Sequence, residues 1–274
     1  MEQPNWLPKR LIVCGDSFNI GIGCNDLNTE PYSILLAQHY GIPVVNLAKG
    51  SSTNLSIWLQ VQHAVERLGA GVDDLVLVNE TSSNRFNWFP ESYTEKKPLT
   101  NHLVNYHQYP PYGADSYHHR LSEHPMQSDP EYQGVMYTEN IAGVYDYYDN
   151  FLSRGYDQRG MYYDRLTTES PQRLKLMMDF YASIYDENIS SLQSQAFMMQ
   201  CHLLLSRHNV RHLMMLPNPW AVEKMVPALN LFRLQWGEIT LEYPDTIPSG
   251  HAHAGGHQYA ANIISEKLKQ NGWM

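Results

Sequence analysis

The pattern that most constrains the fold is a series of short apolar runs, each of which stops at a small or polar residue. The first run occupies residues 10–14 and ends at Gly15, and further runs occupy residues 44–47, 75–78 and 212–216. Strands that are buried on both faces of a parallel sheet read as continuous apolar runs of this length. The chain is therefore expected to contain a buried parallel sheet.

Segments with helical periodicity separate these runs. Residues 31–40 and 53–68 carry apolar side chains at helical spacing and connect the first three runs. Two successive strand–helix–strand units imply a right-handed, doubly wound sheet, and hence a three-layer α/β/α domain. Residues 171–209 are expected to be helical throughout, and a last helix is expected to end near residue 270.

Residues 84–170 interrupt this alternation, with 13 of the chain's 19 tyrosines and almost no aliphatic run. We expect one domain over residues 1–274, in which 84–170 is an insertion and not a continuation of the sheet. Tyrosine stacks well on sugars and is also enriched in protein interfaces. A lid, a substrate wall and an assembly surface all remain open for this segment.

Charge and composition limit the classes of partner that the chain is expected to bind. The formal net charge is −9 with no cluster of Lys or Arg, so neither nucleic acid nor an anionic membrane is expected as a partner. Cys14, Cys24 and Cys201 lack zinc or redox spacing, and their odd number argues against a disulfide framework. The sequence has no signal-peptide pattern and no apolar run of about 18 residues, so cytoplasmic synthesis is expected.

Chemistry is expected where loops leave the carboxyl ends of the strands, because ligands bind there in open parallel sheets. In the sequence Gly15-Asp16-Ser17-Phe18, Gly15 permits a tight exit from the strand. Ser17 can then present both its Oγ and its own backbone N–H to a substrate. The competing interpretation is that Asp16 or Ser17 only caps a helix.

Two further loops offer hydrogen-bond donors. In residues 46–54, Gly50 lets a backbone N–H approach a ligand without a side chain in the way. In residues 78–85, Asn79 or Thr81 can point a donor at a developing oxyanion. Helix capping and turn formation explain the same residues equally well, so neither loop is decisive alone.

A histidine-rich loop precedes the last helix and contains His251, His253 and His257. A histidine there can act as the general base that takes a proton from a serine. Metal binding and an incidental solvated loop are the alternatives. No carboxylate or cysteine of ligand spacing accompanies these histidines, so neither a metal nor a cofactor is expected.

The order and spacing of these four loops resemble the SGNH/GDSL hydrolase superfamily, whose blocks supply a Ser, a Gly, an Asn and a C-terminal His. The resemblance spans the two ends of the chain and implies a flavodoxin-like SGNH hydrolase fold. It makes Ser17 the nucleophile, and the N–H groups of Ser17 and Gly50 donors to the oxyanion. His251 becomes the base, with His253 as the alternative.

Two positions depart from this family pattern. Thr81 stands where the family has its oxyanion Asn. The third donor is then Asn79 from a shifted position, the weaker hydroxyl of Thr81, or absent. Ser249 stands where the family has the Asp that orients the imidazole, and Asp245 is near enough in sequence to replace it.

The resemblance implies a metal-independent serine esterase, with an O-acetylated carbohydrate as the first substrate class to consider. The two departures favour a second interpretation, a catalytically degenerate structural or assembly protein on the SGNH fold. Residues 79–85 and the Tyr-rich insertion also resemble SGNH-like proteins of tailed bacteriophages. That likeness implies a virion location, with virion proteins or further copies of the chain as partners.

Overall fold

A six-stranded sheet in the order β5-β2-β1-β3-β7-β8 forms the centre of the fold. Five strands run parallel, and β5 pairs antiparallel with β2 at one edge. The strands are β1 Arg10–Cys14, β2 Val44–Asn46, β3 Asp74–Asn79, β5 His107–Tyr109, β7 Arg211–Leu216 and β8 Leu231–Arg233. The computed structural model describes residues 6–48, 52–83, 85–88, 107–109, 137–140, 179, 183–184, 186–217, 231–244 and 251–273.

The central strands are buried because both of their faces contact apolar clusters. Along β3, Leu75 and Leu77 belong to one cluster, whereas Val76 and Val78 belong to the other. A strand buried in this way has no polar face, which is why it reads as a continuous apolar run. The expected α/β fold with a parallel sheet is therefore confirmed.

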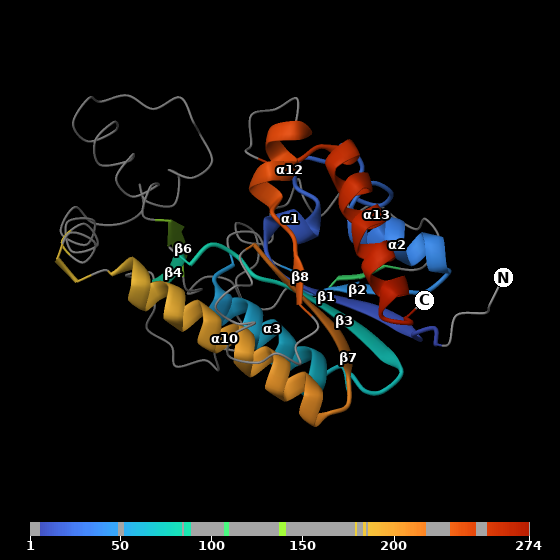
Figure 1. The fold of residues 1–274 in the computed structure, drawn as a ribbon, viewed down its shortest axis with the longest axis horizontal. Coiled ribbons are helices and arrows are strands. Elements are labelled where there is room, and N and C mark those ends of the chain that lie inside the picture. Colours follow the sequence, from blue (N-terminus) through green and yellow to red (C-terminus); the bar gives the residue numbers. More distant parts are fainter. Residues whose placement is uncertain are drawn as a thin grey trace, which may run out of the picture.

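Helices cover both faces of the sheet (Figure 1). One face carries α2 (Tyr32–Tyr40), α12 (Trp236–Glu242) and α13 (Ala254–Gln270), and the other carries α3 (Asn54–Glu66) and α10 (Glu187–Arg207). Thr53 caps α3 by accepting the backbone N–H of Ser56. Asp186 caps α10 by accepting the backbone N–H groups of Asn188 and Ile189, so the continuous helix expected over 171–209 is interrupted at Asp186, and α10 begins at Glu187.

The expectation that the segment 84–170 adds nothing to the sheet is wrong. Its residues His107–Tyr109 form the edge strand β5, and β4 (Arg85–Trp88) pairs with β6 (Tyr137–Asn140) in a separate two-stranded sheet. An edge strand is held by backbone hydrogen bonds on one side, so it needs no apolar run that sequence patterning can detect. The remainder of this segment lies outside the described residues.

The connections place the end of β1 at a reversal in the sheet. From β1 the chain passes through α2 to β2 on one side, and then through α3 to β3 on the other side. Loops that leave neighbouring strands at such a reversal diverge to opposite faces, which opens room for a ligand. The short helix α1 (Ser17–Ile20) begins at this point.

Candidate active site

Gly15 and Asp16 shape the turn that follows β1. The Asp16 carboxylate accepts the backbone N–H of Phe18 at 3.1 Å, and the Asn19 side chain accepts that of Asp16 at 3.1 Å. A Cβ atom at Gly15 would overlap the Asn19 side chain, so this reciprocal cap requires a glycine there. The turn places Ser17 at the first position of α1.

The side chains of Ser17 and His251 meet although the two residues are 234 positions apart in the sequence. Nε2 of His251 lies 2.7 Å from Oγ of Ser17. The Phe18 ring packs on the imidazole with the ring centroids 4.7 Å apart, and it also stacks on Trp236 at 5.2 Å. A serine hydroxyl held this close to an imidazole nitrogen can pass its proton to that nitrogen while Oγ attacks an electrophile.

The other two histidines of this loop have different partners. Nδ1 of His253 accepts the Gly255 N–H at 2.7 Å, which caps α13. His257 is fully buried, and its Nδ1 accepts the backbone N–H of Tyr32 at 3.4 Å. Burial lowers the pKa of His257 to about 3, so this ring is neutral near pH 7. Among these three histidines, the hydrogen bond to Ser17 belongs to His251.

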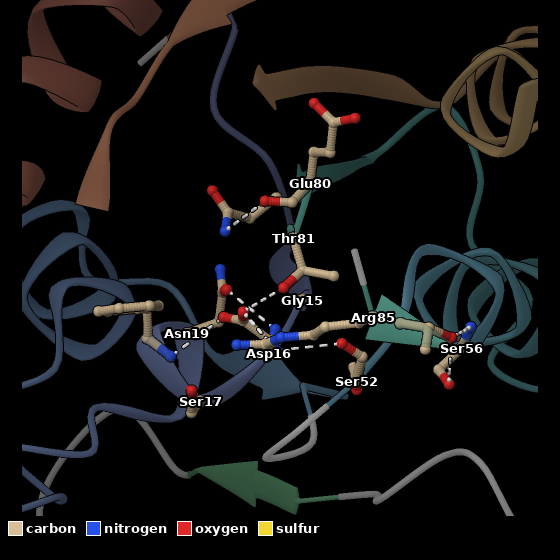
Figure 2. Close-up of polar contacts among 12 residues, drawn as sticks. Gly15, Asp16, Ser17, Asn19, Ser52, Ser56, Glu80, Thr81 and Arg85 are labelled. Atoms are coloured by element: carbon tan, nitrogen blue, oxygen red, sulfur yellow. Dashed lines mark hydrogen bonds and ion pairs between the residues drawn. The ribbon is translucent and has the colours of Figure 1, made fainter. Parts of the chain in front are cut away.

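A buried ion pair lies behind Ser17 (Figure 2). Oδ2 of Asp16 accepts the Thr81 hydroxyl at 2.6 Å and Nη1 of Arg85 at 3.1 Å. The same Nη1 donates to the carbonyl oxygen of Ser52 at 3.1 Å. The side chains of Asp16 and Arg85 are only 3% and 12% exposed. The network joins the turn after β1 to the loops that follow β2 and β3.

Amide side chains hold the loops around this network. The Gln60 amide on α3 accepts the Gly15 N–H at 2.7 Å and donates to the Gly15 carbonyl at 3.0 Å. At the end of β2, Nδ2 of Asn46 donates to the carbonyl oxygen of Asn19 at 2.8 Å. These bonds fix both ends of the turn that carries Ser17. Gly50, the expected oxyanion amide, lies outside the described residues.

The two candidate donors after β3 differ in how their side chains are engaged. Thr81 donates its one hydroxyl hydrogen to Asp16. Its backbone is held by the Asn54 side chain, which accepts the Thr81 N–H at 2.9 Å and donates to the Thr81 carbonyl at 3.0 Å. Nδ2 of Asn79 donates to the Glu80 carbonyl at 3.3 Å, and its buried Oδ1 bonds no described residue. The Asn79 side chain therefore keeps an amide oxygen without a described partner, whereas the hydroxyl hydrogen of Thr81 is already donated.

Comparisons with known proteins give no match, so the site is described from its geometry alone. No family model matches the chain. A search of curated proteins also gives no match. Within the described ranges, no group of three or more His, Cys, Asp or Glu side chains is placed to hold a metal ion. In that same part of the chain, no helix is long and apolar enough to cross a membrane.

The structural roles of Arg85, Gln60 and Asn54 were not predicted from the sequence, and three residues named there have positions that are not described. Gln60 and Asn54 are buried on α3, where a polar side chain needs a partner, and this signal was available in the sequence. A single arginine gives no indication of the carboxylate it will meet. Gly50 is one of these three. The others are Asp245, the candidate for orienting His251, and Ser249, which stands at the family's Asp position.

Glu80 is a further titratable group at this edge of the sheet. It follows the last residue of β3, and its side chain points away from Thr81 and Asp16 in Figure 2. Burial raises the pKa of its carboxyl group to about 7. The Glu80 side chain therefore gains and loses its proton near neutral pH without belonging to the Asp16 network.

Proposed function

We propose that the protein is a metal-independent serine esterase of the SGNH/GDSL type. The observation that carries this proposal is the 2.7 Å approach of His251 Nε2 to Ser17 Oγ. Its position adds support, because Ser17 follows β1 at the reversal of the sheet, where ligands bind in open α/β folds. The order β2-β1-β3-β7-β8 also corresponds to the 2-1-3-4-5 order of flavodoxin-like sheets.

In the proposed reaction, Oγ of Ser17 attacks the carbonyl carbon of an ester and the hydroxyl proton moves to Nε2 of His251. This transfer requires the neutral tautomer with its hydrogen on Nδ1, so that Nε2 faces Ser17 as an acceptor. The tetrahedral intermediate collapses as His251 returns the proton to the leaving alcohol. Water, deprotonated by the same Nε2, then releases the acid and regenerates Ser17.

The oxyanion is assigned first to backbone donors. The Ser17 N–H is at the start of α1, where an amide has no intrahelical acceptor, and it bonds no described residue. The Gly50 N–H is the second proposed donor. Asn79 is the side-chain candidate, since the hydroxyl hydrogen of Thr81 is already donated to Asp16. Removing one donor of this kind lowers kcat by roughly 10²-fold to 10³-fold in other hydrolases.

The remaining parts of the proposal follow the resemblance to the family. Asp245 is the proposed partner that orients His251 and stabilises its charged form. An O-acetylated carbohydrate is the proposed substrate, since the tyrosines of the segment 84–170 suit a wall that stacks against sugar rings. Hydrolysis would then release acetate and leave the sugar hydroxyl free.

A second candidate function is a catalytically degenerate structural or assembly protein of a bacteriophage virion. The observation that favours it is the Thr81 hydroxyl, which bonds Asp16 at 2.6 Å and so does not serve an oxyanion in this conformation. Ser249, at the position where the family has Asp, points the same way. Under this alternative, the contact between Ser17 and His251 carries no turnover.

Acetate release separates the two functions. The purified protein is incubated with p-nitrophenyl acetate and with a per-O-acetylated sugar, beside the Ser17→Ala variant and an exposed-serine control, Ser206→Ala on α10. The esterase proposal expects kcat to fall by about 10⁴-fold or more in Ser17→Ala and to stay unchanged in Ser206→Ala. Absence of turnover in the wild type, or equal turnover in Ser17→Ala, would support the assembly function.

A further inference from the structure

The Asp16 carboxylate makes three hydrogen bonds to three separate parts of the chain. Oδ1 accepts the backbone N–H of Phe18 in its own turn. Oδ2 accepts the Thr81 hydroxyl from the end of β3 and Nη1 of Arg85 from the start of β4. Since Asp16 directly precedes Ser17, any rotation of this carboxylate alters the cap of the helix that begins at the nucleophile.

Arg85 supplies the positive charge that balances this buried carboxylate. The Asp16 side chain is 3% exposed and that of Arg85 is 12% exposed, so water does little to solvate either charge. A carboxylate taken out of water is tolerated when it is paired and hydrogen-bonded, and it is strongly disfavoured when its partner is removed. Loss of Arg85 would therefore force the Asp16 side chain to move towards solvent or to bind a proton.

Arg85 also links the turn to a second loop. Its Nη1 bridges Oδ2 of Asp16 and the carbonyl oxygen of Ser52, each at 3.1 Å (Figure 2). Ser52 precedes α3 and stands two residues after Gly50 in the sequence. A single guanidinium group thus joins the turn that carries Ser17 to Ser52, the residue before the cap of α3.

We propose that Arg85 is a positioning residue for catalysis, which fixes the Ser17 turn through Asp16 and acts together with Thr81. This inference rests on the proposed esterase function. Arg85 bonds neither Ser17 nor His251 among the described contacts, so its effect passes through Asp16. Displacement of a nucleophile by about 1 Å can cost about 10²-fold in rate, so a residue that holds the turn affects kcat without contacting the substrate.

The chain offers a matched control at the amino ends of β1 and β3. Arg10 on β1 pairs with Asp74 on β3 through bonds of 2.7 Å and 3.1 Å, in a partly buried site at their amino ends. Arg10→Gln and Arg85→Gln each remove one guanidinium from an ion pair with an aspartate. Both variants are expected to unfold at lower temperature than the wild type, but Arg85 alone is bonded to the nucleophile turn.

The test measures esterase kinetics and amide hydrogen exchange on the folded full-length chain. Arg85→Gln is expected to lower kcat by about 10-fold to 100-fold with KM changed less than about twofold, whereas Arg10→Gln keeps the wild-type kcat. Thr81→Val is expected to lower kcat in the same direction, and Thr81→Ser to restore it, because serine keeps the hydroxyl donor. A wild-type kcat in Arg85→Gln would overturn the inference.

Hydrogen exchange decides the inference even if the wild type has no esterase activity, in which case the proposed function fails by itself. The amides of residues 18–20 are expected to exchange faster in Arg85→Gln and in Thr81→Val than in the wild type or Arg10→Gln. Unchanged exchange at these amides in Arg85→Gln would show that Arg85 does not fix the turn. If the wild type is inactive and these amides exchange faster in Arg85→Gln, Arg85 fixes the turn but has no role in catalysis.

Discussion

The backbone of Gly23 lies against the carbonyl oxygen of Ala252, the residue that follows His251. A Cβ atom at Gly23 would overlap this oxygen and would stand 3.1 Å from Cβ of His251. The φ angle of Gly23 is 102°, a value that residues with a side chain rarely adopt. The segment after α1 thus holds the loop of the proposed base, and it needs a glycine to do so.

Gly23→Ala is expected to displace the His251 loop and to lower kcat by about 10-fold, because the imidazole moves away from Ser17. The matched control is Gly41→Ala. Gly41 also has a positive φ, 66°, but a Cβ atom there meets open space. Both variants should lose about 1–2 kcal/mol of stability from backbone strain. Equal kcat values for the two variants would remove Gly23 from the positioning of His251.

The two neighbouring histidines are expected to separate in function. His251→Gln should reduce esterase turnover by about 10³-fold or more, since Nε2 of His251 is the proposed proton acceptor. His253→Asn should stay within about twofold of the wild type, because asparagine can replace the cap that His253 provides to α13. Steady-state kinetics with p-nitrophenyl acetate checks both. The opposite result would make His253 the base.

Glu80→Gln is expected to stabilise the protein at alkaline pH only. Burial raises the pKa of Glu80 from 4.5 to about 7, so the folded state retains a proton that the unfolded state has lost between those values. Stability from this group is complete below about pH 4.5 and is lost as the pH rises towards 7. Thermal unfolding should show a gain of about 1–2 kcal/mol for the variant near pH 8 and none near pH 4.

A buried histidine far from the candidate site is expected to make folding sensitive to acid. Burial lowers the pKa of His212 from 6.5 to about 4, and its Nδ1 bonds the Val210 carbonyl at 2.8 Å. The unfolded chain binds a proton in this interval that the folded chain does not, so stability falls as the pH falls from about 6.5 to 4. His212→Gln should not show this loss of about 2–3 kcal/mol in the free energy of unfolding. Urea titrations at several pH values between 6.5 and 4 check this.

Local patterns were sufficient to predict the frame of the molecule. The apolar run at 10–14 and the glycine that ends it identify β1 and the turn that begins at Gly15, because a strand buried on both faces leaves a strong local signal. The helix α13 and the histidine loop before it were also predicted from local sequence patterns. The carboxyl ends of parallel strands share one edge, which is why Ser17 was expected among the loops there. That His251 would lie beside Ser17 was implied by the resemblance to the SGNH/GDSL family.

The polar network behind Ser17 was not predictable in this way. Asp16 bonds Thr81 and Arg85, which lie 65 and 69 residues away in the sequence. The periodicity of a sequence indicates local structure and cannot identify such distant pairs. Thr81 was considered for the oxyanion because of its position in the loop, but the direction of its hydroxyl depends on where the Asp16 carboxylate lies. The strand β5 was not predicted either, because its pairing with β2 depends on backbone hydrogen bonds that leave no side-chain pattern in the sequence.

The most direct test of the account is covalent labelling of Ser17. The intact protein, Ser17→Ala and His251→Gln are treated with a fluorophosphonate probe, and the modified peptide is located by mass spectrometry. The Ser17–His251 contact predicts one adduct on Ser17, slower labelling in His251→Gln and none in Ser17→Ala. An unlabelled wild type, or an adduct on another residue that persists in Ser17→Ala, would contradict the assignment of Ser17 as an activated nucleophile.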